Sequence, residues 1–292
     1  MANPQILDPV DPDVELSSPL TMAIARRDQD TMSMVRRAVE RRQVLLAFQP
    51  IMQSRQPDRV AFHEGLIRVT DHTGRIIPAR DFIDVVEREE LGRVLDTLAL
   101  DLGLQALAEE PSLRLSINLS ARSIGYPRWK ATLVHWLDRD PTLGERLILE
   151  ITERTAIVLP ELVQHFMGEM QGHGISFALD DFGAGYTAFR YLKDFYFDIL
   201  KIDGAFTKDI ANNPDNQVIC QAMLSLAQHF DMLTVAENVE TRDDALFLAQ
   251  AGCDFLQGFF FGMPTVNPAW RRATRARPDQ AAGGGPNTRL RA

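Results

Sequence analysis

This chain has little cysteine, no long apolar run and no excess of positive charge, and each of these features excludes a class of protein. The 292 residues include only two cysteines, Cys220 and Cys253, and no CxxC motif. We expect two reduced, buried thiols, with a disulfide or a metal-binding role as the alternative. No run of 18 apolar residues occurs, and residues 1–16 are acidic and proline-rich rather than basic and then apolar. The chain is therefore expected to lack a membrane-spanning helix and a secretory signal, and to be a soluble, cytoplasmic protein.

The charge balance limits the choice of partner. Forty acidic residues exceed 31 basic ones, which gives a formal net charge of −9 at pH 7. Proteins that bind nucleic-acid polymers neutralise phosphates with many Lys and Arg side chains, so an acidic chain argues against such a partner. A small anionic ligand held through metal ions is compatible with this charge. The length suits one α/β barrel, which uses about 250 residues.

The sequence pattern divides the chain into four parts. Residues 1–28 are expected to be a disordered leader, 29–43 a helix, 44–268 the folded domain and 269–292 a flexible C-terminal tail. Within the domain, β-rich runs occur at 44–51, 60–69, 113–120, 146–152, 175–182, 198–203, 233–239 and 255–261. Helical patterns occur at 79–91, 93–108, 127–139, 160–172, 186–194, 215–230 and 242–251.

Eight strands with helices between most of them predict parallel crossovers and closure into an α/β barrel. The first two strands are joined by a short link without a helix, which favours an antiparallel pair near the N-terminus. In LRLSINLS (113–120), Ser116 and Asn118 fall on the face opposite Leu115 and Ile117. A strand of an open doubly wound sheet would be apolar on both faces. The polar face therefore indicates a barrel interior near its functional end.

Acidic and amide side chains recur along the middle strands, where a parallel barrel would bring them to one end. They are Glu64, Asn118, Glu150, Asp180, Asp181 and Glu237, with Lys201 among them. Two unit charges about 4 Å apart repel by ~4 kcal/mol at an effective dielectric of 20, so the carboxylates cannot share a pocket as bare anions. Either most are protonated, or divalent cations neutralise them, as is usual in phosphate chemistry. Because no candidate ligand is a histidine or cysteine, hard cations are favoured over zinc.

Two motifs supply part of this set, and each has a plainer alternative. In HEGLIR, Glu64 and Arg68 share a strand face and could reach a metal and a phosphate or base. An exposed ion pair on an edge strand is the alternative. In LEITE, Glu150 lies in the strand and Glu153 at its end, where a βα loop begins. A solvated pair of strand-end carboxylates is the alternative there.

The most informative local motif is ALDDFGAGYTAF, in which two aspartates end a strand and lead into glycines. Asp180 and Asp181 point to opposite faces of a regular strand, so both can reach one site only if the backbone turns there. Gly183 and Gly185 permit such a turn and a mobile loop. The alternative is a side-chain-capped turn followed by a helix that Thr187 caps.

Eight short motifs follow one another between residues 44 and 265: FQPI, EGLIR, SINLS, EITE, DDFGAGY, KID, AENVE and QGFFFGMP. In this order they resemble the EAL-domain family of cyclic di-GMP phosphodiesterases. The resemblance implies a modified TIM barrel with two Mg²⁺ or Mn²⁺ ions. It also implies hydrolysis of one diester bond of cyclic di-GMP, which gives linear pGpG.

The motif match assigns a role to each candidate residue. Ligands of the first ion would be Glu64, Asn118, Glu150 and Asp180, and ligands of the second Asp180, Asp181 and Glu237. Lys201 would orient the nucleophilic water and Glu153 would hold the DDFGAG loop, so that Lys201, Glu153 and Glu237 are the expected catalytic residues. Gln49, Arg68 and Gln257 would contact the ligand. These residue types imply in-line attack on phosphorus by a hydroxide held between two metal ions.

The chain departs from the commonest family pattern at three positions. Gly65 and Ala184 stand where alanine and threonine are usual, and Asn238 replaces the glycine that usually follows Glu237. Asn238 is expected to crowd the second metal site. Since no proposed ligand is lost, an active enzyme is favoured over a catalytically silent cyclic di-GMP receptor or interaction module. A different Mg²⁺-dependent chemistry on a barrel, such as enolate formation with a lysine base, would leave the double aspartate unexplained.

Aromatic residues gather after the glycine loop, at Phe189, Tyr191, Phe195 and Tyr196. Their position and the family resemblance predict a homodimer formed near residues 187–195. The alternative is that these side chains pack on the barrel. Control would then act through this interface, a partner protein or the helix around residues 32–42.

Overall fold

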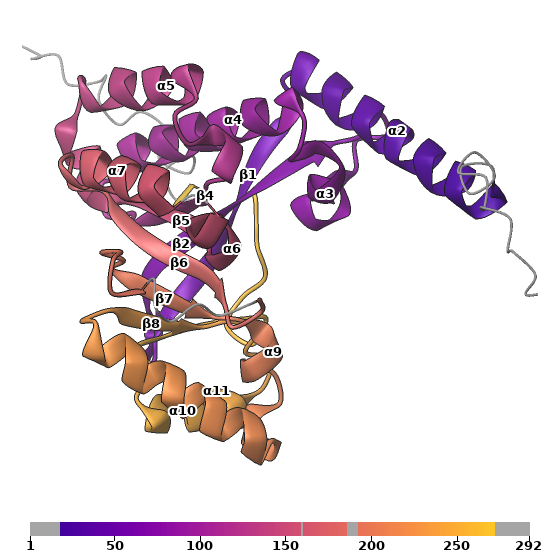
Figure 1. Ribbon diagram of the computed structural model, residues 1–292. Helices are drawn as coiled ribbons and strands as arrows, with labels where there is room; N and C mark the ends of the chain where they lie inside the picture. The colour runs from indigo at the N-terminus through magenta and orange to yellow at the C-terminus, as the bar shows by residue number, and fades with distance from the viewer. Residues whose placement is uncertain (1–17, 159, 186–191, 272–292) are drawn as a thin grey trace, which may run out of the picture.

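The computed structural model describes residues 18–158, 160–185 and 192–271, and its centre is a closed barrel (Figure 1). Over these residues the strands form one sheet in the order β1-β9-β8-β7-β6-β5-β4-β2-β3, and pairing of β1 with β2 closes a ring of eight with β3 outside it. The strands are β1 (Val44–Gln53), β2 (Gln56–Thr70), β3 (Ile76–Pro78), β4 (Leu115–Asn118), β5 (Leu147–Thr152), β6 (Ser176–Phe182), β7 (Ile199–Ile202), β8 (Leu233–Ala236) and β9 (Phe255–Gln257). The predicted barrel is confirmed.

Helices cover the outside of this barrel (Figure 1). The α-helices are α2 (Pro19–Glu40), α3 (Ile83–Val86), α4 (Glu90–Glu109), α5 (Pro127–Leu137), α6 (Glu153–Val158), α7 (Pro160–Gln171), α9 (Gly204–Thr207), α10 (Pro214–His229) and α11 (Arg242–Ala251). Short 3₁₀ turns are η1 (Ala79–Asp81), η2 (Ala121–Ser123), η3 (Pro141–Arg146) and η4 (Ile210–Asn212). None of these helices combines the length and apolarity that crossing a bilayer needs.

One strand of the ring runs against the others. β1 pairs antiparallel with β2 and with β9, whereas β2 pairs in parallel with β4, and β4 to β9 follow in parallel. The expected antiparallel pair is thus confirmed. Its register sets Gln49 beside Glu64, so a residue of the reversed strand reaches the same level as the candidate metal ligands.

The barrel interior is layered. Its floor is a compact buried cluster of apolar side chains: Ile51, Phe62, Ile148, Ala178, Ile199 and Val235. Side chains alternate along a strand, so the residues two positions away face the interior again. These residues are Gln49, Glu64, Glu150, Asp180, Lys201 and Glu237. The alternation therefore stacks a polar layer directly on an apolar floor.

Two apolar clusters lie outside the barrel interior. The larger one packs the outer faces of the strands against the surrounding helices and includes Phe48, Leu104 and Phe177. The smaller one joins α2 to β2, α3 and α4 through residues such as Val35 and Leu95. Only the C-terminal half of α2 is anchored in this way. Its N-terminal half projects from the body (Figure 1), with exposed residues including Leu20 and Met22.

The ends of the folded part differ from the sequence prediction. Helix α2 begins at Pro19 rather than at residue 29, so 19–28 are helical and not part of a disordered leader. Ser18 accepts a hydrogen bond from the Thr21 amide and Pro19 occupies the first turn, a combination that starts helices. Trp270, assigned to the flexible tail, packs edge-on against Phe48 at 5.1 Å between ring centroids. Residues 1–17, 186–191 and 272–292 lie outside the described residues.

Candidate active site

The polar layer is centred on Lys201, which is only 1% exposed. Its ammonium group lies 2.7 Å from carboxylate oxygens of Glu150, Asp180 and Glu237, and 3.9 Å from Glu64. These partners come from β2, β5, β6 and the end of β8, so barrel closure alone brings them to one lysine. The alternative of a solvated strand-end pair is excluded for Glu150 and Glu153, since both are buried.

A second group of side chains is connected through Glu64. Its Oε1 accepts a hydrogen bond from the Asn118 amide at 2.9 Å, and its Oε2 accepts one from Gln257 at 2.5 Å. Gln257 also donates to Gln49 at 3.2 Å, and Gln49 donates to the Gly262 carbonyl at 3.2 Å. Glu64 is buried on a strand with neighbours on both sides, which rules out the exposed edge-strand ion pair.

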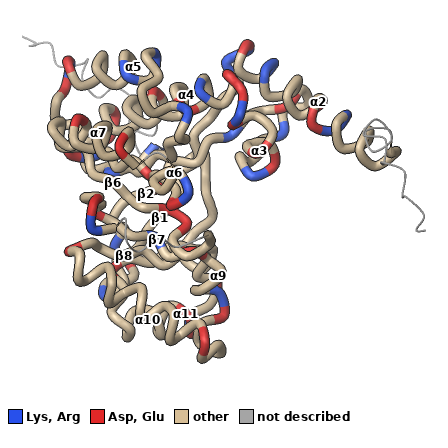
Figure 2. Tube along the Cα trace, in the orientation of Figure 1, with Lys and Arg blue, Asp and Glu red and all other residues tan. Residues whose placement is uncertain are grey.

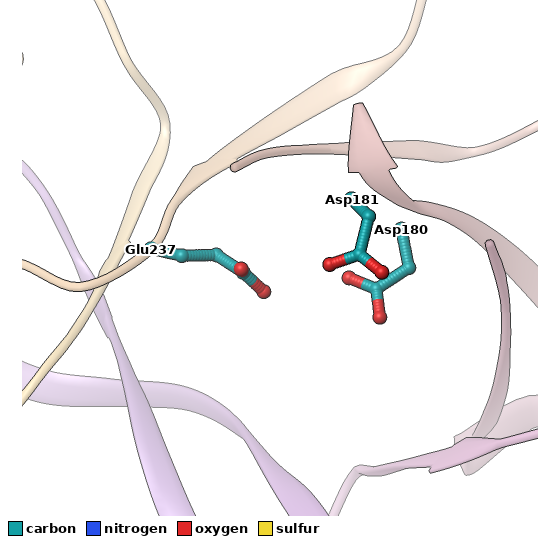
Figure 3. Close-up of side chains that lie close together, drawn as sticks. All are labelled: Asp180, Asp181 and Glu237. Atoms are coloured by element: carbon teal, nitrogen blue, oxygen red, sulfur yellow. The ribbon is translucent and has the colours of Figure 1, made fainter. Parts of the chain in front are cut away.

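The backbone turns at the pair of aspartates, as the sequence predicted. Asp181 has a φ of 56°, in the left-handed region, and the β6–β7 pairing is irregular between Leu179 and Phe182. The reversal at Asp181 brings both aspartates to the same side. Carboxylate oxygens of Asp180, Asp181 and Glu237 lie within 4.8 Å of one another (Figure 3).

Burial and mutual repulsion shift the acidities of this group. Burial raises the pKa of Glu237 to about 8 and the pKa of Asp181 to about 6, and the Asp180 charge adds to both effects. Burial also raises the pKa of Glu150 well above 4.5, although Lys201 opposes it. Burial alone would lower the pKa of Lys201, but the surrounding carboxylates outweigh it and raise that pKa well above 10.5. The site therefore favours one buried cation and disfavours further bare anions.

The donor set fits hard divalent cations. Glu150 Oε2 accepts a hydrogen bond from the Lys201 ammonium, whereas the buried Oε1 of the same carboxylate accepts none from the described residues. Leaving a buried carboxylate oxygen without a donor is costly, and a divalent cation would satisfy it. The candidate ligands offer only oxygen atoms, which suits Mg²⁺ or Mn²⁺ better than zinc.

Glu153 lies just outside this layer and contacts the glycine loop. Its Oε2 accepts a hydrogen bond from the Gly183 amide at 3.2 Å. Gly183 has a φ of 99°, and a Cβ there would lie 2.6 Å from Met223 and 2.7 Å from Phe206, so only glycine fits. Glu153 is thus hydrogen-bonded to the first glycine of this loop.

A cavity of about 260 Å³ opens above the polar layer. Its lining includes Gln49, Glu64, Asp180, Asp181, Lys201, Glu237 and Gln257. Arg68 is not among the lining residues; its guanidinium donates to the Ile67 carbonyl at 2.9 Å. Leu66, Gly258 and Phe259 also line the cavity. They lie within the EGLIR and QGFFFGMP motifs, but the sequence pattern assigned them no role, because an apolar side chain or a glycine carries no group that indicates a binding site.

Two departures from the family pattern have local explanations. A Cβ on Gly65 would lie 2.6 Å from the Ile117 Cδ1 atom, so the isoleucine methyl already fills the space of an alanine. Asn238 has a φ of 51°, a conformation that glycine and asparagine tolerate better than most residues. Its side chain packs closely against Gly204, and Asn238 also lines the cavity.

Comparison with known proteins agrees with this geometry. The family model described as "EAL domain" matches residues 32–264. Cyclic di-GMP phosphodiesterase PdeF of Escherichia coli (strain K12) is 31% identical over 250 residues, which cover 83% of this chain and 33% of PdeF. The bifunctional diguanylate cyclase/cyclic di-GMP phosphodiesterase MucR of Pseudomonas aeruginosa is 30% identical over 235 residues, covering 79% of this chain and 34% of MucR.

A solved structure of a related domain has the same fold. The PaMucR phosphodiesterase in complex with c-di-GMP superposes with a TM-score of 0.74 and 29% identity, covering 83% of this chain and 99% of that one. The chain spans about a third of the length of the two curated relatives. With the family model matching most of the chain and the barrel and its carboxylate layer in place, this chain belongs to the EAL domain family.

Proposed function

We propose that this chain hydrolyses cyclic di-GMP to linear pGpG with two Mg²⁺ or Mn²⁺ ions. The observation that carries the proposal is the buried cage in which Lys201 meets Glu150, Asp180 and Glu237 at 2.7 Å each. Together with Asp181, the layer holds five carboxylates and one ammonium, a formal charge of −4, which two divalent cations would match. The names of PdeF and MucR and the ligand in the PaMucR structure support the choice of substrate.

The residues divide into three working groups. Glu64, Asn118, Glu150, Asp180, Asp181 and Glu237 would hold the cations. When bound, the cations would activate water and neutralise charge developing on the phosphate. Lys201 keeps three carboxylates in fixed positions and would align the attacking water with phosphorus. The remaining role belongs to Glu153, which restrains the loop after Asp181.

Ligand recognition is proposed for Gln49, Gln257 and Arg68. Gln49 and Gln257 line the cavity. Gln257 Oε1 is buried and accepts no hydrogen bond within the described part of the chain, so it offers an acceptor to a ligand N–H or O–H group. Arg68 lies on the same face of β2 as Glu64, two pleats further along. To contact a ligand, its guanidinium would have to leave the Ile67 carbonyl.

The surface residues and the net charge bear on partners other than the nucleotide. Acidic and basic residues are interspersed along the outer helices, α2 included (Figure 2), and the net charge of −9 argues against a nucleic-acid polymer as a partner. Homodimer formation near residues 187–195 remains part of the proposal, although residues 186–191 lie outside the described residues. Of the aromatics invoked, Tyr196 is 80% exposed, but Phe195 is buried in the main core and cannot contribute to an interface. The cytoplasmic location and a regulatory partner stay predictions.

Turnover with purified protein tests the reaction. Cyclic di-GMP is incubated with the chain and Mg²⁺ or Mn²⁺, and pGpG is quantified by chromatography. Conversion that disappears in a folded Glu64→Ala or Asp180→Ala variant is the expected result. The second candidate is a silent receptor, which the Asn238 side chain beside Glu237 favours. Binding of cyclic di-GMP without pGpG in either metal would establish the receptor instead.

Light scattering tests the dimer. The proposal expects twice the chain mass at micromolar concentration. A fully active monomer at high micromolar concentration would remove both the dimer and its coupling to the site.

A further inference from the structure

Asp96, a carboxylate outside the polar layer of the barrel, accepts several hydrogen bonds from the segment that follows β4. Asp96, in α4, accepts three bonds at a single atom, Oδ2. The donors are the Ser120 amide at 3.2 Å, the Ser120 hydroxyl at 2.5 Å and the Ser123 hydroxyl at 2.6 Å. The Ser120 hydroxyl also lies 3.3 Å from that of Ser123. Charge-assisted bonds of this kind are about twice as strong as neutral ones.

The donors sit at the exit of β4, directly after a candidate metal ligand. β4 is only four residues long and ends at Asn118. The next amide, of Leu119, donates to the Glu150 carbonyl at 2.9 Å, and the one after it, of Ser120, donates to Asp96. The two residues immediately after Asn118 are therefore both fixed by hydrogen bonds from their backbone amides, Leu119 to the barrel and Ser120 to α4.

Asn118 needs this support because its own side chain has little. It is exposed, and the side-chain hydrogen bond described for it goes to Glu64 Oε1 at 2.9 Å. Packing therefore does not fix its rotamer, and its position depends on the backbone on which it is carried. A ligand oxygen displaced by about 1 Å no longer suits the near-ideal octahedral geometry that Mg²⁺ demands.

The helix that carries Asp96 is held in place by the residues on either side of it. Leu95, the neighbour of Asp96 in α4, is buried in the smaller apolar cluster with residues of α2 and β2. Thr97, on its other side, donates its hydroxyl to the Arg93 carbonyl at 2.8 Å within the helix. Asp96 is thus presented from a fixed helix, and the serines bond to a fixed point.

We propose that Asp96 is a positioning residue of the metal site, which sets the place of Asn118 through Ser120 and Ser123. It touches neither substrate nor metal. The inference rests on the proposed metal-dependent function, because it assigns Asp96 an effect on the ligand geometry of that site. The plainer alternative is that the Asp96 bonds merely stabilise the fold.

Measuring Mn²⁺ binding in the absence of nucleotide distinguishes a positioning role of Asp96 from a purely structural one. Mn²⁺ is titrated calorimetrically into purified wild-type chain and into Asp96→Ala, Asp96→Asn and Ser123→Ala variants whose folding is checked by circular dichroism. The matched control is Asp101→Ala, which removes another α4 carboxylate whose hydrogen bond, from Trp136 at 2.8 Å, lies away from the site.

The proposal expects Asp96→Ala to bind Mn²⁺ about 10-fold more weakly or worse, the loss typical of removing an outer-shell partner. Ser123→Ala should show a smaller loss, Asp96→Asn should recover most of the affinity because it keeps an acceptor oxygen, and Asp101→Ala should match wild type. If Asp96→Ala fails to fold, the Ser123→Ala comparison decides. Lower melting temperatures with unchanged Mn²⁺ affinity would overturn the proposal in favour of the structural role.

Failure of the proposed function would look different. If wild-type chain binds Mn²⁺ yet releases no pGpG, the reaction fails while the Asp96 comparison still stands. If wild-type chain binds no Mn²⁺, the metal site and the positioning role are both overturned.

Discussion

Restoring the usual alanine next to Glu64 should destabilise this protein, because Ile117 already occupies the space. A Cβ built on Gly65 would lie 2.6 Å from Ile117 Cδ1, 3.0 Å from Leu46 Cδ2 and 3.2 Å from the Ser116 carbonyl oxygen. Carbon atoms prefer about 3.5–4.0 Å, so the Ile117 methyl would have to move by ~1 Å.

The backbone of α4 limits the space into which that methyl can move. A Cβ on Gly103 of α4 would lie 2.9 Å from the same methyl, which shows how close the helix backbone comes. Overpacking a filled core costs about 1–3 kcal/mol, and we expect Gly65→Ala to lose that much unfolding free energy. Ile117→Val removes the obstructing methyl and by itself should cost about 0.5–1.5 kcal/mol.

The double variant tests the argument. Gly65→Ala combined with Ile117→Val should be more stable than the sum of the single effects predicts, with a coupling of at least about 1 kcal/mol. Urea unfolding followed by circular dichroism, in EDTA so that no metal contributes, measures all four proteins. Gly65→Ala as stable as wild type, or strictly additive single effects, would refute this explanation of the glycine.

Three further outcomes are expected. Lys201→Ala should lower kcat by at least about 10²-fold with little change in KM, measured as pGpG release; a loss confined to affinity would make Lys201 a phosphate contact. Chelator-treated protein should regain turnover with Mg²⁺ or Mn²⁺, and full recovery with zinc alone would contradict the oxygen-ligand argument. In EDTA, stability should decline between about pH 5 and pH 8, since folding raises the pKa of Asp181 to about 6 and of Glu237 to about 8, and protons that stabilise the folded state are lost over that range. Thermal melts should show a shallower decline for Glu237→Gln; an unchanged slope would contradict the assignment.

The barrel was predictable because its signals are local. Alternating strands and helices gave the strand number, and the missing helix between the first two strands gave the antiparallel pair. The turn at Asp181 followed from a simple requirement, that adjacent residues must reach one site. β3, α6 and α9 were missed because each is six residues or fewer, too short for a hydrophobic period.

The site was predictable in its residues but not in its connections. Glu64, Glu150 and Lys201 stood out as polar positions on apolar strands, whereas the Gln49–Gln257–Glu64 hydrogen bonds depend on register across the closing seam. Asp96 gave no signal, because a single aspartate in an amphipathic helix is ordinarily solvated. The start of α2 could have been found from Ser18 and Pro19, had the capping pattern been weighed above the proline content of the leader.

The reversed direction of β1 decides on which side of the barrel the chain enters. In a uniformly parallel barrel, the segment before the first strand arrives at the face opposite the strand ends that carry the chemistry. Here β1 descends from Val44 towards the apolar floor at Ile51, so α2 joins the barrel at the rim where the carboxylates lie. A displacement of α2 would therefore act directly on the rim that carries the candidate metal ligands, without passing through the packed floor of the barrel.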